Sequence, residues 1–375
     1  MQRANLKKKK KNLQVIAMRA LILGSLLGLI VITMMLGASQ ASDNPTVINL
    51  MIDAELPPSA TEEQAAIAEK NLEDIFDQIR MRGLVATVFA TQDAVISEIG
   101  LDITRIGHSS KFELAMSGNH SGEKIGTMSY EDQLASLKLS KVYVESCKVC
   151  GQNEVTVYGF MPQSFDQNEQ TYKALDTIGI LYNTGFQAGL MYAPGHEDDV
   201  WPYLAEGYKF YAVPVSTYTL SDKKVVLQDS YFEENGLDAN QWYDALVGKF
   251  DEIQGKDEPL VISLTTSLSG SGEYLDALNK FMDYAKSKNA AFITTMDLVN
   301  LAKSGVHDVS SLPTNTSEPC PTCGQGENST IKINTLIENP KEAPCETCGN
   351  KSNDAQISVS SSNTQEAPAS GAIPA

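Results

Sequence analysis

A short polar loop holds the side chain best suited to chemistry in this chain. The loop reads SGNHSGEKIG over residues 117–126 and holds His120, one of only four histidines. Imidazole is the commonest metal ligand in proteins and titrates close to physiological pH. A second ligand four residues further on would complete a pair, but that position is Lys124, whose ammonium group repels a divalent cation. The loop alone therefore leaves open a working site, the remnant of a site or an ordinary loop.

The cysteines form a second set with regular spacing. All six fall in three Cys-x-x-Cys pairs, and 21 residues separate the last two of these pairs, which are Cys147/Cys150, Cys320/Cys323 and Cys345/Cys348. The spacing of the last two pairs is typical of a zinc ribbon with four thiolate ligands. Disulfides, or free thiols at a reducing surface, are the alternatives. The first pair fits a local disulfide, or a link to one of the other pairs.

The charge of the chain excludes one class of partner. Its 375 residues carry a net charge of −18, and its hydrophobic content of 42% is enough for a large core. Seven Lys and Arg residues precede the first acidic residue, so the rest of the chain is more acidic still. Such a chain repels phosphate backbones, and no nucleic-acid partner is expected.

The N-terminal region predicts export. Residues 1–44 combine a basic head with an apolar run of 19 residues from Ala20 to Ala38, which is long enough to span a bilayer. The basic head predicts a single-pass anchor with the lysines in the cytoplasm and the bulk of the chain outside. A cleaved signal peptide, cut after the small residues 39–41, would instead give a secreted protein. Glycosylation sequons at Asn119, Asn315, Asn328 and Asn350 agree with export.

The middle of the chain, residues 45–308, is predicted to fold as one α/β domain. Buried strand patterns at 46–53, 84–90, 154–160, 180–185, 209–215, 259–265 and 290–294 alternate with helical patterns, including 61–83, 129–145, 168–179 and 273–289. Thr61 and Gln64 form a capping-box signature at the start of the first of these helices. Strand–helix alternation of this length predicts parallel strands, outer helices and a closed, barrel-like sheet.

The amino-acid composition changes over residues 309–375. They are rich in Ser, Thr, Asn, Pro and Gly and have few apolar residues to bury. This composition predicts a disordered C-terminal tail that carries the last two cysteine pairs.

Five segments, in a fixed order, carry a resemblance to a known family. They are INLMIDAE (48–55), GLVATVFA (83–90), the loop and helix at 117–141, the strand, helix and strand at 157–186, and PLVISLTTSL with the closing helix and strand (259–299). Together they resemble the polysaccharide deacetylase family, the NodB-homology esterases that remove acetyl groups from N-acetylated sugar polymers. The resemblance covers about residues 46–305. It implies a distorted (β/α)7 barrel.

The resemblance also implies a chemistry, which this sequence keeps only in part. Family members hold a divalent metal with one Asp and two His, and the metal activates a water. A second Asp acts as base, an Arg orients it and a later His acts as acid. Asp53 matches the base, as a vestige, and His120 matches the first metal histidine. The other roles fall on residues that cannot perform them, namely Ala54 for the metal Asp, Lys124 for the second His, Met161 for the Arg, and Thr265 or Thr266 for the acid.

Glu55 offers a substitute ligand. It follows Asp53 by two residues, so both side chains can reach the barrel mouth, where His120 would complete a site suited to Zn, Fe or Mn. The alternative is that Asp53 and Glu55 are loop residues that cap the next helix or pair with Lys124.

The expected protein is an exported, membrane-tethered, deacetylase-like barrel that acts on N-acetylated glycans or envelope polysaccharides, with weakened or lost catalysis. The alternative is a non-catalytic glycan-binding or envelope protein with a metal-binding or disulfide-linked tail.

Overall fold

The computed structural model describes residues 44–56, 59–97, 99–107, 109–146 and 155–312. Within these residues, the centre of the molecule is a sheet of seven neighbouring parallel strands. In spatial order they are β10 (Leu260–Thr265), β1 (Val47–Ala54), β2 (Ala86–Ala90), β3 (Phe112–Met116), β4 (Gly159–Phe160), β5 (Tyr182–Gln187) and β7 (Tyr211–Val215). Two short strands extend this sheet: β6 (Tyr203–Leu204) runs antiparallel to β7, and β11 (Ala291–Ile293) runs parallel to β1.

The sheet closes into a barrel through residues outside its strands. Ser216, directly after β7, donates its backbone N–H to the carbonyl oxygen of Val261 in β10 at 2.9 Å, and its Oγ accepts from the Val261 N–H at 2.9 Å. Leu227 donates to the carbonyl oxygen of Ser216, and Ser263 donates to that of Leu227. The predicted barrel is thus present, and its distortion is this seam between β7 and β10.

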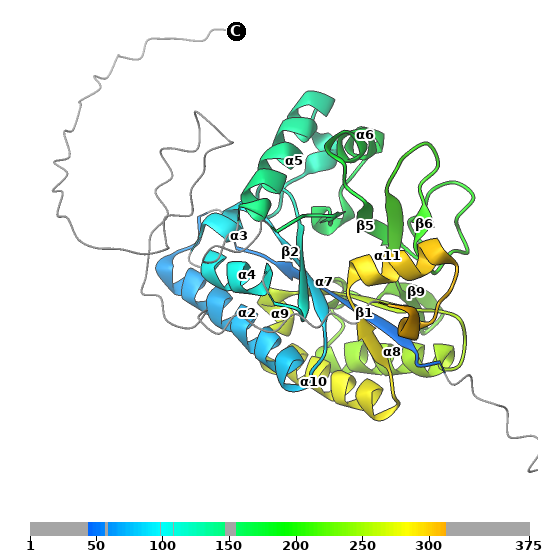
Figure 1. Ribbon diagram of the computed structural model, residues 1–375. Helices are drawn as coiled ribbons and strands as arrows, with labels where there is room; N and C mark the ends of the chain where they lie inside the picture. The colour runs from blue at the N-terminus through cyan, green and yellow to red at the C-terminus, as the bar shows by residue number, and fades with distance from the viewer. Residues whose placement is uncertain (1–43, 57–58, 98, 108, 147–154, 313–375) are drawn as a thin grey trace, which may run out of the picture.

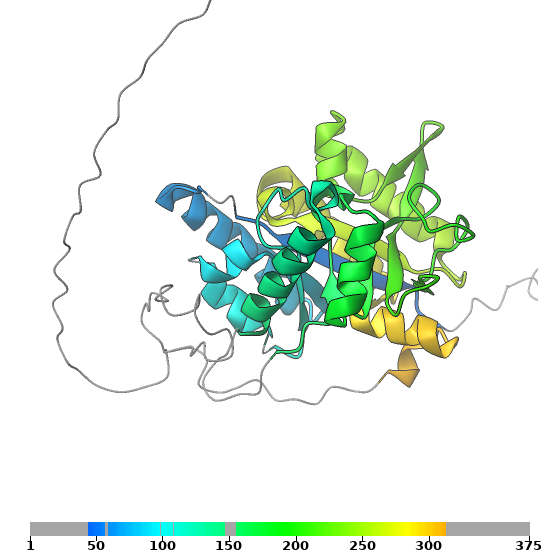
Figure 2. The ribbon, with the colours of Figure 1, turned by 90° about the horizontal axis from the view of Figure 1, so that it is seen from above.

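Helices surround the barrel, as Figures 1 and 2 show. The longer ones are α2 (Glu62–Met81), α5 (Tyr130–Glu145), α6 (Glu169–Ile178), α8 (Ala239–Ile253), α10 (Gly272–Ser287) and α11 (Thr295–Ser304). The short helices are α3 (Gln92–Ile96), α4 (Gly100–Gly107), α7 (Asp229–Glu234) and α9 (Thr266–Ser269), with 3-10 turns at Ile125–Thr127, Gln163–Phe165 and Val309–Ser311. A hairpin of β8 (Thr217–Leu220) and β9 (Lys223–Val226) packs near the seam.

Apolar side chains form two layers because successive strand residues point to opposite faces. One layer fills the space between the sheet and the helices and includes Ile48, Leu50, Ile52 and Ala54 of β1. The other fills the barrel interior and includes Met51, Phe89, Ala115, Tyr182 and Val261. This alternation places Asp53 on the same side of β1 as Met51, so its carboxyl group faces the barrel axis.

The amino end of the barrel, here called the floor, is sealed by a buried polar cluster. Glu113 accepts hydrogen bonds from the backbone N–H of Met296 at 2.8 Å, from Thr87 Oγ1 at 3.0 Å and from Tyr182 Oη at 2.7 Å. Burial raises the pKa of Glu113 although these donors oppose the shift. Because Met296 lies in the first turn of α11, the carboxyl group also occupies the favourable end of that helix dipole.

The structure confirms most of the predicted elements and corrects others. Thr61 and Gln64 form the predicted capping box, and α6 ends at Gly179 in a left-handed conformation with φ 74°. The predicted strand at 154–160 is reduced to two residues, β4, within the residues the structure describes. Sequence patterns did not predict β3, the β8–β9 hairpin or α8.

Two sequence predictions fall on the ends of the chain. Residues 20–38 and 313–375 lie outside the described ranges, so the predicted anchor and most of the predicted tail are untested. In the part of the chain that is described, no helix is long and apolar enough to cross a membrane. Val309 and Leu312 pack against the barrel interior, so the packed body runs past the predicted boundary at residue 308.

Candidate functional site

The carboxyl ends of the strands form the opposite end of the barrel, here called the mouth, which is where parallel barrels place their functional residues. Asp53 lies at the end of β1, in register with Phe89 of β2 and Thr265 of β10. Ser117 follows β3, and Gln163 comes three residues after β4. Parallel pairing therefore brings Asp53 and Gln163 together, although 110 positions separate them in the chain.

Asp53 is buried, with 6% of its surface exposed. Its Oδ2 accepts a hydrogen bond from Gln163 Nε2 at 3.2 Å, whereas its Oδ1 is buried and accepts from no N–H or O–H group of the described residues. Burial raises the pKa of Asp53 well above its ordinary value, and the charge of Glu55 raises it further. An ionised Asp53 is therefore disfavoured, which opposes the role of general base that the resemblance assigns to this position.

Asp53 and Glu55 form a pair of interacting carboxyl groups at the mouth. Burial raises the pKa of both groups, and the charge of Glu55 raises that of Asp53 further. The pair therefore favours a protonated carboxyl group, which is a hydrogen-bond donor.

Gln163 connects three parts of the mouth. Its Nε2 donates to Ser117 Oγ at 2.5 Å and to Asp53 Oδ2, and its Oε1 accepts from the backbone N–H of Gly122 at 3.2 Å. The turn that carries it bends sharply, with φ of 50° at Ser164 and 58° at Phe165, values that non-glycine residues seldom adopt. Gln163 was missed by sequence reasoning. The Pro162-Gln163 step directly after β4 was its only signal.

The position assigned to the orienting Arg has a different role. Met161 is buried among the apolar side chains of the barrel interior, and its carbonyl oxygen accepts from Ser117 Oγ at 3.2 Å. A neutral amide from Gln163, two residues further on, contacts Asp53 instead. Because an amide brings no positive charge, it lowers the pKa of Asp53 less than a guanidinium would.

The loop around His120 is held by its own side chains. Glu123 is buried and accepts from the backbone N–H of Asn119 at 3.0 Å and from Ser136 Oγ at 2.6 Å. Gly118 has φ of +94°, and a Cβ there would lie 2.7 Å from Glu123 Oε2, so glycine is required. The glycine and the acidic residue of the loop therefore have structural roles.

The hydrogen-bond partners of His120 are Asp93 and Asn119, and neither belongs to the carboxyl pair. Its Nδ1 lies 3.0 Å and 3.1 Å from the two carboxylate oxygens of Asp93, and its Nε2 lies 2.9 Å from Asn119 Nδ2. Its side chain is 52% exposed. Nδ1 is thus the protonated nitrogen, donating to Asp93, while Nε2 accepts from Asn119, so both ring nitrogens are engaged. Asp93, the first-turn residue of α3 that holds this ring, was not singled out from the sequence.

The donor set does not fit a resident divalent metal. Ala54 has no ligand atom and is buried in the layer between the sheet and the helices. Lys124 is exposed beside the loop. Among the residues that the structure describes, no group of three or more His, Cys, Asp or Glu side chains is arranged to hold a metal ion. The substitute site of Asp53, Glu55 and His120 is therefore not assembled among these residues, and His120 contacts Asp93 and Asn119 instead.

The two threonines in the place of the acid histidine support the surrounding backbone. Thr266 Oγ1 accepts from the backbone N–H of Glu55 at 3.3 Å, and Thr265 donates its N–H to Asp229 Oδ2 at 2.8 Å. Asp229 also accepts from Ser269 Oγ at 2.7 Å, and burial raises its pKa to about 6. This buried acid was missed from the sequence because nothing predicted the short helix α7 that begins with it.

The predicted cysteine sites lie outside the described residues. Cys147 and Cys150 fall in the range 147–154, and Cys320, Cys323, Cys345 and Cys348 fall in 313–375. Their zinc, disulfide and free-thiol alternatives all stay predictions.

Comparisons with known proteins agree with this geometry at the level of the fold. Comparisons with protein-family models and with curated proteins found no match. A probable polysaccharide deacetylase from Pseudomonas aeruginosa PAO1 matches with a TM-score of 0.53 at 17% identity, over 69% of this chain and 91% of that one. Puue allantoinase matches with a TM-score of 0.54 at 17% identity, over 70% of this chain and 92% of that one. The chain therefore has the fold of the polysaccharide deacetylases, as the resemblance in its sequence predicts, and this fold also carries a different activity.

Proposed function

We propose that this chain is an exported, membrane-tethered protein that binds N-acetylated glycans through a polysaccharide deacetylase-like barrel, and that metal-dependent deacetylation by this barrel is weakened or lost. The fold neighbour described as a polysaccharide deacetylase supports the glycan, together with the matching segments of the sequence. The basic head and the apolar run before residue 44 support the tether.

The single observation that carries the loss of catalysis is the bonding of His120, the residue that matches a metal ligand. Its Nδ1 contacts Asp93 and its Nε2 contacts Asn119. A metal would have to displace these partners and would still lack the ligands that Ala54 and Lys124 fail to supply. The chemistry of the mouth is instead that of a neutral acid and an amide, which suits hydrogen bonding to the polar but uncharged acetamido groups of a glycan.

The test compares hydrolysis with binding in the full chain. Purified protein is assayed for metal content, for acetate release from a β-1,4-linked N-acetylglucosamine oligomer, and for binding to the same oligomer by calorimetry. We expect binding without stoichiometric metal and without acetate. Acetate release that tracks bound metal would overturn the loss of catalysis, and the absence of binding would overturn the glycan ligand.

The tether and the cysteine tail have separate tests. Sedimentation with the membrane fraction that resists high salt but not detergent is expected for an anchor, and a soluble secreted chain would contradict it. We propose zinc as the ligand of the last two cysteine pairs. Thiols that become reactive after chelation alone would support zinc, and thiols that appear only after reduction would show disulfides instead.

A further inference from the structure

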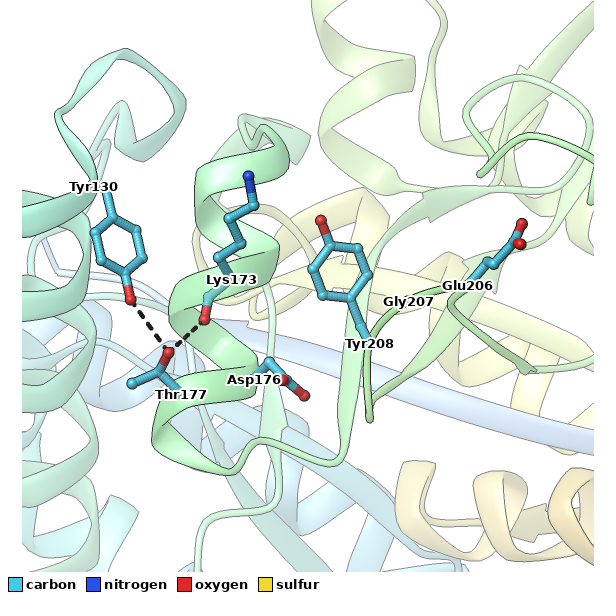
Figure 3. A pocket seen from close by; sticks show the side chains of 7 residues that line it. All are labelled: Tyr130, Lys173, Asp176, Thr177, Glu206, Gly207 and Tyr208. Atoms are coloured by element: carbon cyan, nitrogen blue, oxygen red, sulfur yellow. Dashed lines mark hydrogen bonds between the residues drawn. The ribbon is translucent and has the colours of Figure 1, made fainter.

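An open groove lies against α6, in the helix layer, and its lining does not include Asp53, Glu55 or Gln163. It has a volume of about 510 Å³ and is lined by Tyr130, Lys173, Asp176, Thr177, Glu206, Gly207 and Tyr208. Figure 3 shows Tyr130 on one side of α6 and Tyr208 on the other, with Lys173 between them. This region is called the α6 groove below. Nothing in the mouth depends on these side chains.

Two tyrosine rings form the walls of the α6 groove, and both are held in place. The Tyr208 ring lies 5.5 Å from the ring of Phe210 and 5.6 Å from that of Tyr172, measured between ring centroids. Tyr130 Oη is 3.2 Å from Thr177 Oγ1, so this hydroxyl group ties the ring to α6. Rings fixed in this way offer a large contact area at little cost in conformational entropy.

The polar groups of the α6 groove are close to balanced in charge. Lys173 Nζ pairs with Glu169 at 2.8 Å, and Asp176 accepts the backbone N–H of Lys209 at 2.9 Å with the Lys209 ammonium 3.8 Å away. Glu206 is exposed on the turn before β7 and adds one further negative charge. A groove with this charge balance, on a chain of net charge −18, disfavours anionic ligands.

We propose that the α6 groove is a second, docking site for a neutral N-acetylated sugar chain. The C–H groups of a pyranose ring carry slight positive charge and favour the negative face of an aromatic ring, and a tyrosine lies on each side of the α6 groove. The lysine, threonine and carboxylate groups between the rings supply the donors and acceptors that sugar hydroxyls require. This inference rests on the proposed glycan ligand and adds a site at which the polymer is held outside the barrel.

The test measures binding of a β-1,4-linked N-acetylglucosamine oligomer to the full chain by calorimetry. Tyr208→Leu and Tyr130→Leu remove the rings and keep apolar bulk, and each is expected to weaken binding about tenfold. Tyr208→Phe and Tyr130→Phe keep the rings and are expected to retain most of the affinity. Tyr192→Leu, at a tyrosine that is 45% exposed on the loop after β5, is the matched control and is expected to leave binding unchanged. Melting curves verify that each variant is folded.

The outcomes separate this inference from the proposed function. Loss of binding in the leucine variants, with binding retained in Tyr208→Phe, Tyr130→Phe and the control Tyr192→Leu, supports the docking site. Binding that depends on Gln163 and ignores both tyrosines overturns the docking site and leaves the proposed function standing. Wild-type protein that binds no N-acetylated oligomer overturns the proposed function. Tighter binding of polygalacturonate than of the neutral oligomer overturns the ligand class.

Discussion

At the scale of single residues, the mouth shows how the side chains around Asp53 determine the pKa of its carboxyl group. A metal bound beside Asp53 would stabilise its ionised form, and a guanidinium would do the same. Here a buried amide and a second carboxyl group take those places, and the pKa of Asp53 stays raised. The mouth thus keeps buried polar groups but disfavours the charge that base catalysis needs.

Glu55→Gln tests the electrostatic interaction between Asp53 and Glu55. Removing the Glu55 charge lowers the pKa of Asp53 towards its ordinary value, although burial still raises it. In the wild type both groups have raised pKa values, so their contribution to stability is present at low pH and is lost as pH rises through those values. The free energy of unfolding of the wild type should therefore fall more steeply from pH 4 to pH 8 than that of Glu55→Gln. Glu234→Gln, at an exposed position, is the control. If the free energy of unfolding of the wild type and of Glu55→Gln fell equally with pH, the interaction between Asp53 and Glu55 would be contradicted.

Gln163→Leu tests the hydrogen bonds that join the mouth. Leucine fills nearly the same volume but leaves Asp53, Ser117 and the Gly122 N–H without this partner. We expect a loss of about 2 kcal/mol in the free energy of unfolding, measured with urea. Gln170→Leu, at an exposed position of α6, is the control and should change stability little. A loss no larger than that of the control would show that water replaces the amide.

At the scale of elements, local signals predicted the fold where strands and helices alternate regularly. Thr61 with Gln64 and the glycine at 179 located helix ends because capping is a local interaction. The hairpin β8–β9 and α7 escaped prediction because they are short and gain their stability from the seam. The position of the candidate site in the barrel was predictable, since Asp53 ends one strand and His120 lies in the loop after another. The hydrogen-bond partners of these residues were not predictable, because Asp93 and Gln163 reach them through contacts that only the folded barrel creates.

Asp229→Asn tests the acid that joins α7, β10 and α9. Burial raises the pKa of Asp229 from its ordinary value to about 6, so the favourable protonated form is lost as pH rises through 6. The stability of the wild type relative to Asp229→Asn should fall by roughly 2 kcal/mol between pH 4 and pH 7. Urea unfolding of both proteins across this range measures the difference. A difference that stays constant or grows with pH would show that Asp229 is ionised throughout.

At the scale of the whole molecule, the barrel closes through a seam that has no regular strand ladder. Strand ladders join β10 to β1 and β5 to β7, whereas Ser216, Leu227 and Gln228, which lie outside the sheet strands, connect β7 to β10. Two of these bonds involve Ser216 and the backbone of Val261. Local opening of the barrel is therefore expected at this seam.

Ser216→Ala tests the seam. The change removes the Oγ that accepts from the Val261 N–H and leaves the backbone bond of Ser216 intact. We expect a loss of about 1 kcal/mol and faster amide hydrogen exchange at Val261, with little change at Met51 in the middle of β1. Exchange that rises equally at both amides would show that the barrel opens only as a unit.

The floor of the barrel has a consequence for how the molecule is oriented. β1 begins there, and the last described residues end there as well. Val309 and Leu312 pack against the barrel interior. His307 stacks on Trp201, with 3.6 Å between ring centroids, and its Nδ1 contacts Asp257. Both ends of the described body therefore emerge opposite the mouth. An attachment to a membrane through residues before 44 would place the floor nearest the membrane and point the mouth away from it. The side of the body that carries the α6 groove would then be free to contact a polymer that lies parallel to the membrane surface.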